Sequence, residues 1–246
     1  MKRKDWKGDI VFSHSMAIFR GHVGDNKLHS HWASQLTISL DDQLRFETEA
    51  GAQSAKAVYF PSKTPHRLET GFICSIYFDP LADVIPNALN RKAVDGWAAL
   101  SIDELPQELT AINAHTDLRA LMHSDLLSPT DATAAESRFE RVIEAIQSQL
   151  AGGHDIDRDS LAEIAHLSPT RFSHWFVERS GVPLRSYKKW LKLRIVVDAV
   201  LEGKNPMEAA MLAGFSDLAH MSRAFAESFG FTYMDAVRAW QNLSEK

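Results

Sequence analysis

The chain has 246 residues, of which 45% are apolar and 24% are charged, with a net charge of −5 and one cysteine. A chain of this length and composition can bury a sizeable core and is expected to form two domains. One cysteine excludes an intramolecular disulfide and a multi-cysteine zinc site, and no apolar run is long enough to cross a bilayer, so we expect a cytoplasmic protein with no membrane partner.

The first third of the chain alternates apolar and polar residues. Residues 36–40 read LTISL and residues 72–78 read FICSIYF, with an apolar side chain at every second position. This period predicts half-buried strands as far as about residue 80, and clusters of turn-forming residues separate them, as in an antiparallel sandwich or barrel. His29 and His31 lie two residues apart on one such strand, so their side chains face the same way.

From about Leu81 the apolar period approaches that of a helix, and prolines keep the predicted helices short. Leu118, Leu121 and Met122 form an apolar stripe that either packs against a second subunit or covers the sheet. The segment LLSPTDATAAES has the composition of a linker. We therefore predict one domain over residues 1–132 and a second over residues 133–246.

The second half opens with an amphipathic helix from Phe139 to Leu150, ended by Gly152 and Gly153, and then contains an internal repeat. Residues 161–181 read LAEIAHLSPTRFSHWFVERSG, and residues 209–230 read AAMLAGFSDLAHMSRAFAESFG. In each copy, small alanines let two helices cross closely, and a tight turn follows. The repeat predicts two helix-turn-helix motifs, at about residues 160–181 and 207–230.

The turn of each motif is expected to need a residue with positive φ and a capping residue for the helix that follows. The turn favours a positive φ, which suits Gly214 in the second copy and is tolerated by His166 in the first. We expect Ser168 and Ser216 to cap the helices that follow by accepting their free N–H groups.

The second helix of each motif leaves one face for DNA. Arg223 is the sharpest candidate for reading a base, because arginine can donate two hydrogen bonds to guanine, and Leu218 and Ala219 can contact thymine methyl groups. Between Arg179 and Arg194 there are six basic residues and no acidic ones, a stripe suited to phosphate contacts. For each residue alone, an ordinary solvated face is the alternative. The predicted DNA-binding residues are Thr170, Arg171, Ser173, His174, Arg179, Lys188, Lys189, Lys192, Leu218, Ala219, His220, Ser222 and Arg223.

From Phe139 to Arg238 the sequence resembles the AraC/XylS family of transcription regulators. The most specific part contains AxxxGFSD, HMSRAF and FG, between Ala209 and Gly230. The resemblance implies two helix-turn-helix lobes joined by a long helix, here Leu184 to Leu201, each lobe placing a helix in the major groove. It also implies double-stranded DNA and RNA polymerase as partners, and a monomer or homodimer that activates or represses transcription. Tyr233 departs from the family pattern, since a proline usually stands there.

With His66, the same-face histidines His29 and His31 resemble the cupin pattern of many AraC-type sensor domains. Metal-binding cupins hold a divalent ion with such histidines and a glutamate, whose place Gln35, a neutral and poorer ligand, takes here. We predict that His29, His31, Gln35 and His66 orient a small effector, with no cofactor. The alternatives are a divalent metal at the three histidines, or side chains that only hydrogen-bond strand backbone.

The predicted fold class is therefore α+β, with a cupin-like antiparallel β-barrel and short helices followed by an all-α domain with two helix-turn-helix motifs. We predict a sequence-specific, effector-controlled transcription regulator and no enzyme. Two alternatives stay open. One is a metal-dependent cupin enzyme with a helical appendage, and the other is an effector-independent regulator whose first domain only dimerises.

Overall fold

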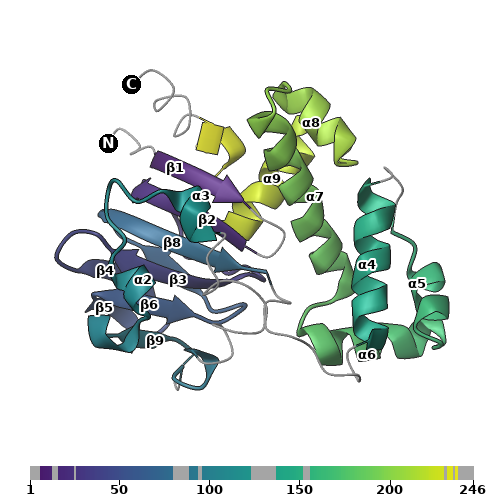
Figure 1. The fold of residues 1–246 in the computed structure, drawn as a ribbon, viewed down its shortest axis with the longest axis horizontal. Coiled ribbons are helices and arrows are strands. Elements are labelled where there is room, and N and C mark those ends of the chain that lie inside the picture. The colour runs from purple at the N-terminus through teal and green to yellow at the C-terminus, as the bar shows by residue number, and fades with distance from the viewer. Residues whose placement is uncertain are drawn as a thin grey trace. The chain divides into compact units, whose positions relative to one another are not determined.

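In a computed structural model, the chain forms two compact units, one of residues 1–129 with 222–246 and the other of residues 130–221. Figure 1 labels their strands and helices. The described residues are 6–12, 16–24, 26–79, 89–93, 96–122, 137–151, 156–229, 232–234 and 236–237.

The strands of the first unit form two antiparallel sheets. The larger sheet has the order β1 (Lys7–Phe12), β2 (Met16–His22), β8 (Phe72–Phe78), β3 (Ser34–Ser39), β6 (Ala57–Phe60) and β9 (Ala98–Leu100). The smaller sheet has the order β5 (Gly51–Ala55), β4 (Leu44–Thr48) and β7 (His66–Leu68).

These sheets confirm the α+β class, but their pairing is not that of a closed barrel. Among the described strands, no ladder joins the two sheets, and one isolated bridge pairs His29 with His66. Pro61 and Pro65 flank the loop that leads from β6 in one sheet to β7 in the other. Because proline cannot donate to a ladder, pairing is interrupted where the chain changes sheets.

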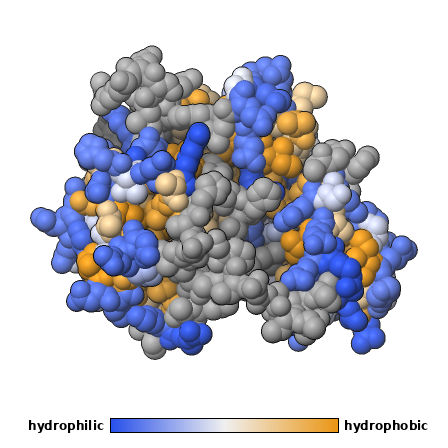
Figure 2. Space-filling view, viewed as in Figure 1, coloured by the Kyte–Doolittle hydropathy of each residue, from blue (hydrophilic) through white to orange (hydrophobic). Residues whose placement is uncertain are grey.

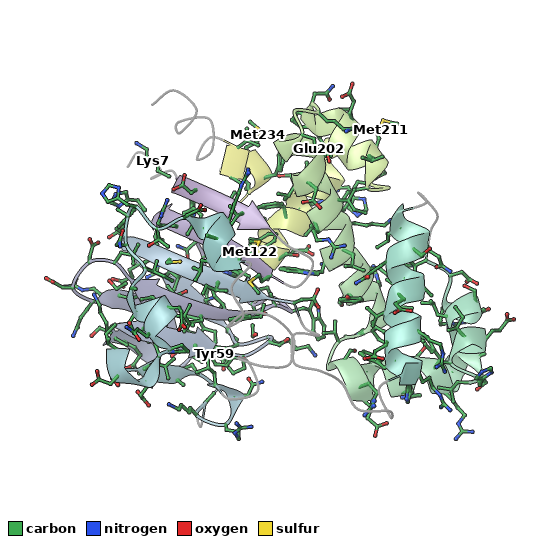
Figure 3. All side chains as sticks on the ribbon, viewed as in Figure 1. Lys7, Tyr59, Met122, Glu202, Met211 and Met234 are labelled. Carbon is green, nitrogen blue, oxygen red and sulfur yellow. The ribbon has the colours of Figure 1, made fainter. Side chains whose placement is uncertain are left out.

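One face of the large sheet is covered by short helices. Leu36, Ile38 and Ile76 belong to a buried cluster with side chains of α2 (Gln107–Thr110) and α3 (Leu118–Met122). A 3-10 helix, η1 (Ile102–Glu104), precedes α2. Figure 1 shows α2 and α3 in front of the sheet, and Figure 3 labels Met122 there. Leu118, Leu121 and Met122 are each less than 10% exposed, so the predicted stripe covers the sheet. The strand β9 also lies in this region, where helices alone were expected.

The opposite face of the sheet is unusual because it buries polar groups. Gln35, Thr37 and Ser39 alternate with the apolar residues of β3, and they are no more than 2% exposed. Ser75 on the neighbouring β8 is fully buried as well. A polar interior needs internal hydrogen bonds, and these bonds lead to the histidines described below.

The second unit is helical. Its helices are α4 (Ser137–Ala151), α5 (Arg158–Ile164), α6 (Pro169–Ser180), α7 (Leu184–Leu201) and α8 (Pro206–Leu212), and α9 (Leu218–Phe229) crosses the division between the units. The long connecting helix has the predicted bounds, and it packs against α6 and α8. None of the helices in the described part of the chain has the length and apolar content needed to span a membrane.

Two predicted features of the domain organisation, the linker and the domain boundary, are not tested by the described residues. Most of the predicted linker, and the Gly152 and Gly153 pair, fall outside the described residues. The boundary between residues 132 and 133 stays a prediction. The second compact unit begins at residue 130, and residues 222–246 belong to the first unit, with the strands.

Candidate nucleic-acid interface and histidine cluster

The first helix-turn-helix motif is built from α5 and α6. Ala162 and Ala165 are no more than 1% exposed, which lets the two helices approach closely. His166 adopts a φ of 52°, as the turn requires. Ser168 stands at the N-cap of α6, but its side chain makes no capping hydrogen bond, contrary to our expectation. Pro169 begins the helix, where a missing N–H costs nothing.

The second motif is built from α8 and α9. Its turn also has a positive φ, as the first does, but the turn residue and the helix cap are different. Gly214 has a φ of 72°, and a Cβ added there would lie 3.2 Å from Nζ of Lys192. Asp217, rather than Ser216, caps α9, because its carboxylate accepts a hydrogen bond from the backbone N–H of His220 at 2.6 Å. The prediction for Ser216 was wrong because a carboxylate one residue closer to the helix takes the role.

Both second helices present an exposed polar face. On α6 the exposed residues are Thr170, Arg171 and His174, and on α9 they are Ala219, His220 and Arg223. Ser173, Leu218 and Ser222 are half-buried at the edges of these faces. The opposite faces bury Phe172 and Phe176 in α6, and Met221 and Phe225 in α9. Figure 2 shows hydrophilic atoms over much of the described surface around α5, and apolar atoms beside α8.

The ring of His220 has a defined position. Its Nδ1 lies 3.1 Å from Oγ of Ser216, and its ring meets that of Phe215 edge-on at 5.2 Å. By contrast, Ser173 donates its hydroxyl proton to the carbonyl of Pro169 at 3.1 Å, so this side chain is already bonded to its own helix.

Part of the basic stripe holds the domain together. Lys188 donates to the carbonyl of Ile156, and Lys192 donates to the carbonyl of Gly214 at 3.1 Å. Both side chains are half-buried, as is that of Lys189, whereas Arg179 is exposed. The stripe therefore has structural contacts that its composition did not reveal, and its role at phosphates stays a prediction.

The four residues of the predicted effector site lie together in the first unit. His29, His31 and His66 each offer a ligand nitrogen, and these atoms lie within 4.8 Å of one another. The ring centroids are 4.7 Å apart for His29 and His66, and 5.0 Å apart for His31 and His66. The Oε1 atom of Gln35 lies 3.0 Å from Nε2 of both His31 and His66.

Residues that our sequence analysis missed extend this cluster into the sheet. The Gln35 amide nitrogen lies 2.8 Å from Oγ1 of Thr37 and 3.3 Å from Oγ of Ser75, and the two hydroxyls are 2.8 Å apart. The ring of Tyr77 stands edge-on to that of His31, with centroids 5.5 Å apart. The contact of Thr37 with Gln35 could have been predicted from the sequence, because the two residues lie two positions apart on one strand. The contact of Ser75 could not, because it depends on the register in which β3 pairs with β8.

Burial makes these histidines weak bases. It lowers the pKa of His31 to about 4 and holds that of His66 well below its usual range, and the neighbouring imidazoles depress the pKa of both further. Burial also lowers the pKa of His29, which is half-buried. Neutral imidazoles with free lone pairs are the form that binds metal ions, so the cluster fits a divalent ion as well as an organic ligand.

Comparison with known proteins finds a matching domain family and two similar folds. Residues 161–238 match a family of helix-turn-helix domains. The apo form of a ToxT variant from Vibrio cholerae strain SCE256 is 8% identical, with a TM-score of 0.56 over 92% of this chain and 98% of ToxT. Wild-type ToxT from that strain with a bound unsaturated fatty acid is also 8% identical, with a TM-score of 0.54 over 98% and 97%. At such identity the likeness concerns the fold.

Proposed function

We propose that the chain is an AraC-type regulator of transcription that reads a two-part DNA site with α6 and α9, because residues 161–238 match a family of helix-turn-helix domains. The observation that carries the proposal is the repeated turn. His166 and Gly214 have positive φ at equivalent positions, and each turn leads into a helix with one exposed polar face. Two such helices suit two successive stretches of major groove.

The exposed residues divide into two roles. We assign the reading of base edges to five exposed residues, Ala219, His220 and Arg223 on α9 and Arg171 and His174 on α6. The cations of the basic stripe are suited to positioning the domain through phosphates, which carry no sequence information.

Selection of bound duplexes from random DNA tests the proposal. The full-length chain is expected to enrich a two-part site spanning about one to two helical turns. A chain that lacks residues 161–246 serves as the control and should enrich nothing. If the full-length protein and residues 133–246 alone both fail to enrich any sequence, the proposed function is wrong.

The phosphate role is tested by the dependence of affinity on salt. Lys189→Ala should weaken binding to all sequences alike and reduce the slope of log affinity against log salt by about 1, because one fewer counterion is released. A loss confined to one sequence would assign Lys189 to base reading instead.

We propose that residues 1–132 form the sensing domain. In this proposal, a small ligand binds at the cluster of His29, His31, His66 and Gln35. ToxT with a bound unsaturated fatty acid, which shares this fold, supports small-ligand binding by the architecture. Thermal unfolding in the presence of a ligand library, repeated with His31→Ala, tests the proposal. Stabilisation that persists in the variant would place the ligand elsewhere.

We further propose that RNA polymerase is a partner of the DNA-bound protein, in the cytoplasm, and that the chain has no catalytic role. Met207, Met211 and Leu212 on α8 are 47%, 67% and 56% exposed, and Figure 3 labels Met211 on this helix. Exposed apolar groups outside the reading faces suit a protein contact. Met211→Lys should lower transcription in a purified system and leave DNA affinity unchanged, and an equal loss in both would contradict this role.

A further inference from the structure

The turn of the second motif contains a chain of hydrogen bonds that ends at His220. Oγ of Ser216 lies 3.1 Å from Oδ2 of Asp217 and 3.1 Å from Nδ1 of His220. The other carboxylate oxygen of Asp217, Oδ1, accepts the backbone N–H of His220 at 2.6 Å. The imidazole also meets the ring of Phe215 edge-on, so a hydrogen bond and a ring contact both hold it in place.

The chain of hydrogen bonds has one direction, because Ser216 has a single hydroxyl hydrogen. An ionised carboxylate only accepts, and hydrogen bonds to charged acceptors are about twice as strong as those between neutral groups. The hydroxyl hydrogen therefore goes to Asp217, and the hydroxyl oxygen is left to accept. In the contact between Ser216 and His220, the imidazole Nδ1–H is then the donor.

This direction fixes the tautomer of His220. A neutral imidazole carries one hydrogen, and when Nδ1 holds it, Nε2 keeps a lone pair. The hydrogen bond at one ring nitrogen thus sets the state of the other. His220 is exposed on the face of α9 that we propose to contact DNA, so its Nε2 offers an acceptor to the major groove.

A single acceptor discriminates among the bases of the major groove. Guanine presents only the acceptors N7 and O6, and thymine presents the acceptor O4 and a methyl group. Amino hydrogens come from N4 of cytosine and from N6 of adenine, but N6 of adenine lies beside the acceptor N7. A lone acceptor therefore fits cytosine best, as the carboxylates of Asp and Glu do.

We propose that His220 reads a cytosine by accepting a hydrogen from its N4 amino group at Nε2, and that Ser216 and Asp217 are positioning residues that hold the imidazole in the required tautomer. This inference rests on the proposed function, in which α9 reads DNA, and adds the base that one residue selects. The first motif has a different sequence here, because Pro169 follows Ser168 where Asp217 follows Ser216.

The tautomer is measurable in the free, full-length protein. With ¹⁵N-labelled histidine, NMR at alkaline pH, which keeps imidazoles neutral, distinguishes the Nδ1–H form from the Nε2–H form by the nitrogen shifts. His220→Gln identifies the signals of this residue. We expect His220 to carry its hydrogen on Nδ1, and an Nε2–H form in the wild-type protein would overturn the inference.

Asp217→Asn should reverse the chain of hydrogen bonds and keep the helix cap. Asparagine caps helices about as well as aspartate through its carbonyl oxygen, and its amide nitrogen then donates to Oγ of Ser216. The hydroxyl hydrogen passes to Nδ1 of His220, which leaves the ring hydrogen on Nε2. Nε2 becomes a donor, so the variant should prefer guanine to cytosine while unfolding at the wild-type urea concentration.

Ser216→Ala is the matched control for this reversal. It breaks the chain and adds no donor, so it should weaken the preference for cytosine without creating one for guanine. An Asp217→Asn variant with the wild-type tautomer and the wild-type base preference would show that Ser216 and Asp217 do not position the ring.

The base is tested on the site that the full-length chain selects, at the position where His220→Ala loses discrimination. Replacement of cytosine there should weaken wild-type binding about 5-fold or more and leave binding by the variant nearly unchanged. N4-methylcytosine, which still pairs with guanine but puts a methyl group in place of the amino hydrogen in the major groove, should weaken wild-type binding as well. A wild-type preference for another base would overturn the inference.

The two proposals fail in different ways. A chain that selects a site at which His220→Ala changes no base preference loses this inference and keeps the proposed function. A chain that selects no site loses the proposed function and the cytosine assignment with it, whereas the tautomer measured in the free protein stands.

Discussion

His166 and Gly214 show how one turn tolerates two very different residues. Their φ angles are 52° and 72°, in the region that favours glycine. A non-glycine residue there costs roughly 1–2 kcal/mol. The first motif bears this cost at His166. The second motif avoids it with Gly214, and the side chain of Lys192 lies close to this glycine.

This difference predicts that substitutions at the two positions change the free energy of unfolding by different amounts. Gly214→Ala should lower the free energy of unfolding by about 1–2 kcal/mol, because it adds both left-handed strain and a contact with Lys192. His166→Gly should change it by less than about 1 kcal/mol, since relief of strain is offset by the greater freedom of glycine in the unfolded chain. Urea unfolding of both variants measures the two values, and equal losses would contradict the explanation.

Arg223 carries the sharpest prediction about DNA. If its guanidinium pairs with guanine, Arg223→Ala should lose preference at one base position and weaken binding to the selected site by about 1–3 kcal/mol. Lys204→Ala removes the same charge from an exposed position between α7 and α8, and it is the control. An unchanged base preference in the Arg223 variant would refute the assignment.

At the scale of elements, α6 and α9, the two helices proposed to read DNA, begin differently. In α9 the carboxylate of Asp217 accepts from the backbone of His220, whereas the Ser168 side chain makes no capping bond to α6. Both helices bury aromatic side chains, Phe172 and Phe176 in α6 and Phe225 and Phe229 in α9, but of the two only α9 begins with a capping carboxylate.

Capping energies should therefore separate the two helices. Asp217→Ala should lower the free energy of unfolding by about 1 kcal/mol, the usual value for loss of a capping side chain. Ser168→Ala should change it by a few tenths of a kcal/mol at most, because no hydrogen bond is lost. Thermal unfolding of the two variants gives the comparison, and a larger loss at Ser168 would show that its hydroxyl caps α6 in solution.

At the scale of the molecule, α9 belongs to more than the helical repeat. Its last residue, Phe229, is 2% exposed, and its ring meets that of Tyr77 on β8 with centroids 5.6 Å apart. Contacts of this kind place residues 222–246 in the same compact unit as the strands. The end of α9 is thus supported by β8, whose Tyr77 also contacts His31 of the histidine cluster.

Removal of the strands should loosen this helix end. In residues 133–246 alone, amide hydrogens in the second half of α9 should exchange faster than in the full chain, while those of α5 and α7 keep their protection. Tyr77→Ala in the full chain should reproduce the effect at Phe229. Equal protection of α9 in the fragment and the full chain would show that Tyr77 contributes nothing to its stability.

Local order was predictable from the sequence because it depends on near neighbours. The repeat of alanines, a turn residue and one phenylalanine predicted both helix-turn-helix motifs, and the bounds of α7 agree with the predicted connector. Such patterns report the spacing of side chains along one element, which backbone geometry alone determines. The strand predicted through His29 and His31 was wrong, because both residues lie between β2 and β3, where an isolated bridge pairs His29 with His66.

Everything that joins distant segments was decided by the tertiary structure. His66, at the start of β7, lies beside His31 because a backbone bridge pairs His66 with His29. Ser75 lies beside Gln35 because β3 and β8 pair in one particular register. The change of sheet at Pro61 and Pro65, which leaves two sheets instead of a closed barrel, also depends on which strands pair. A strand's own sequence specifies which side chains share a face, but the partner strand and the register decide what those side chains touch.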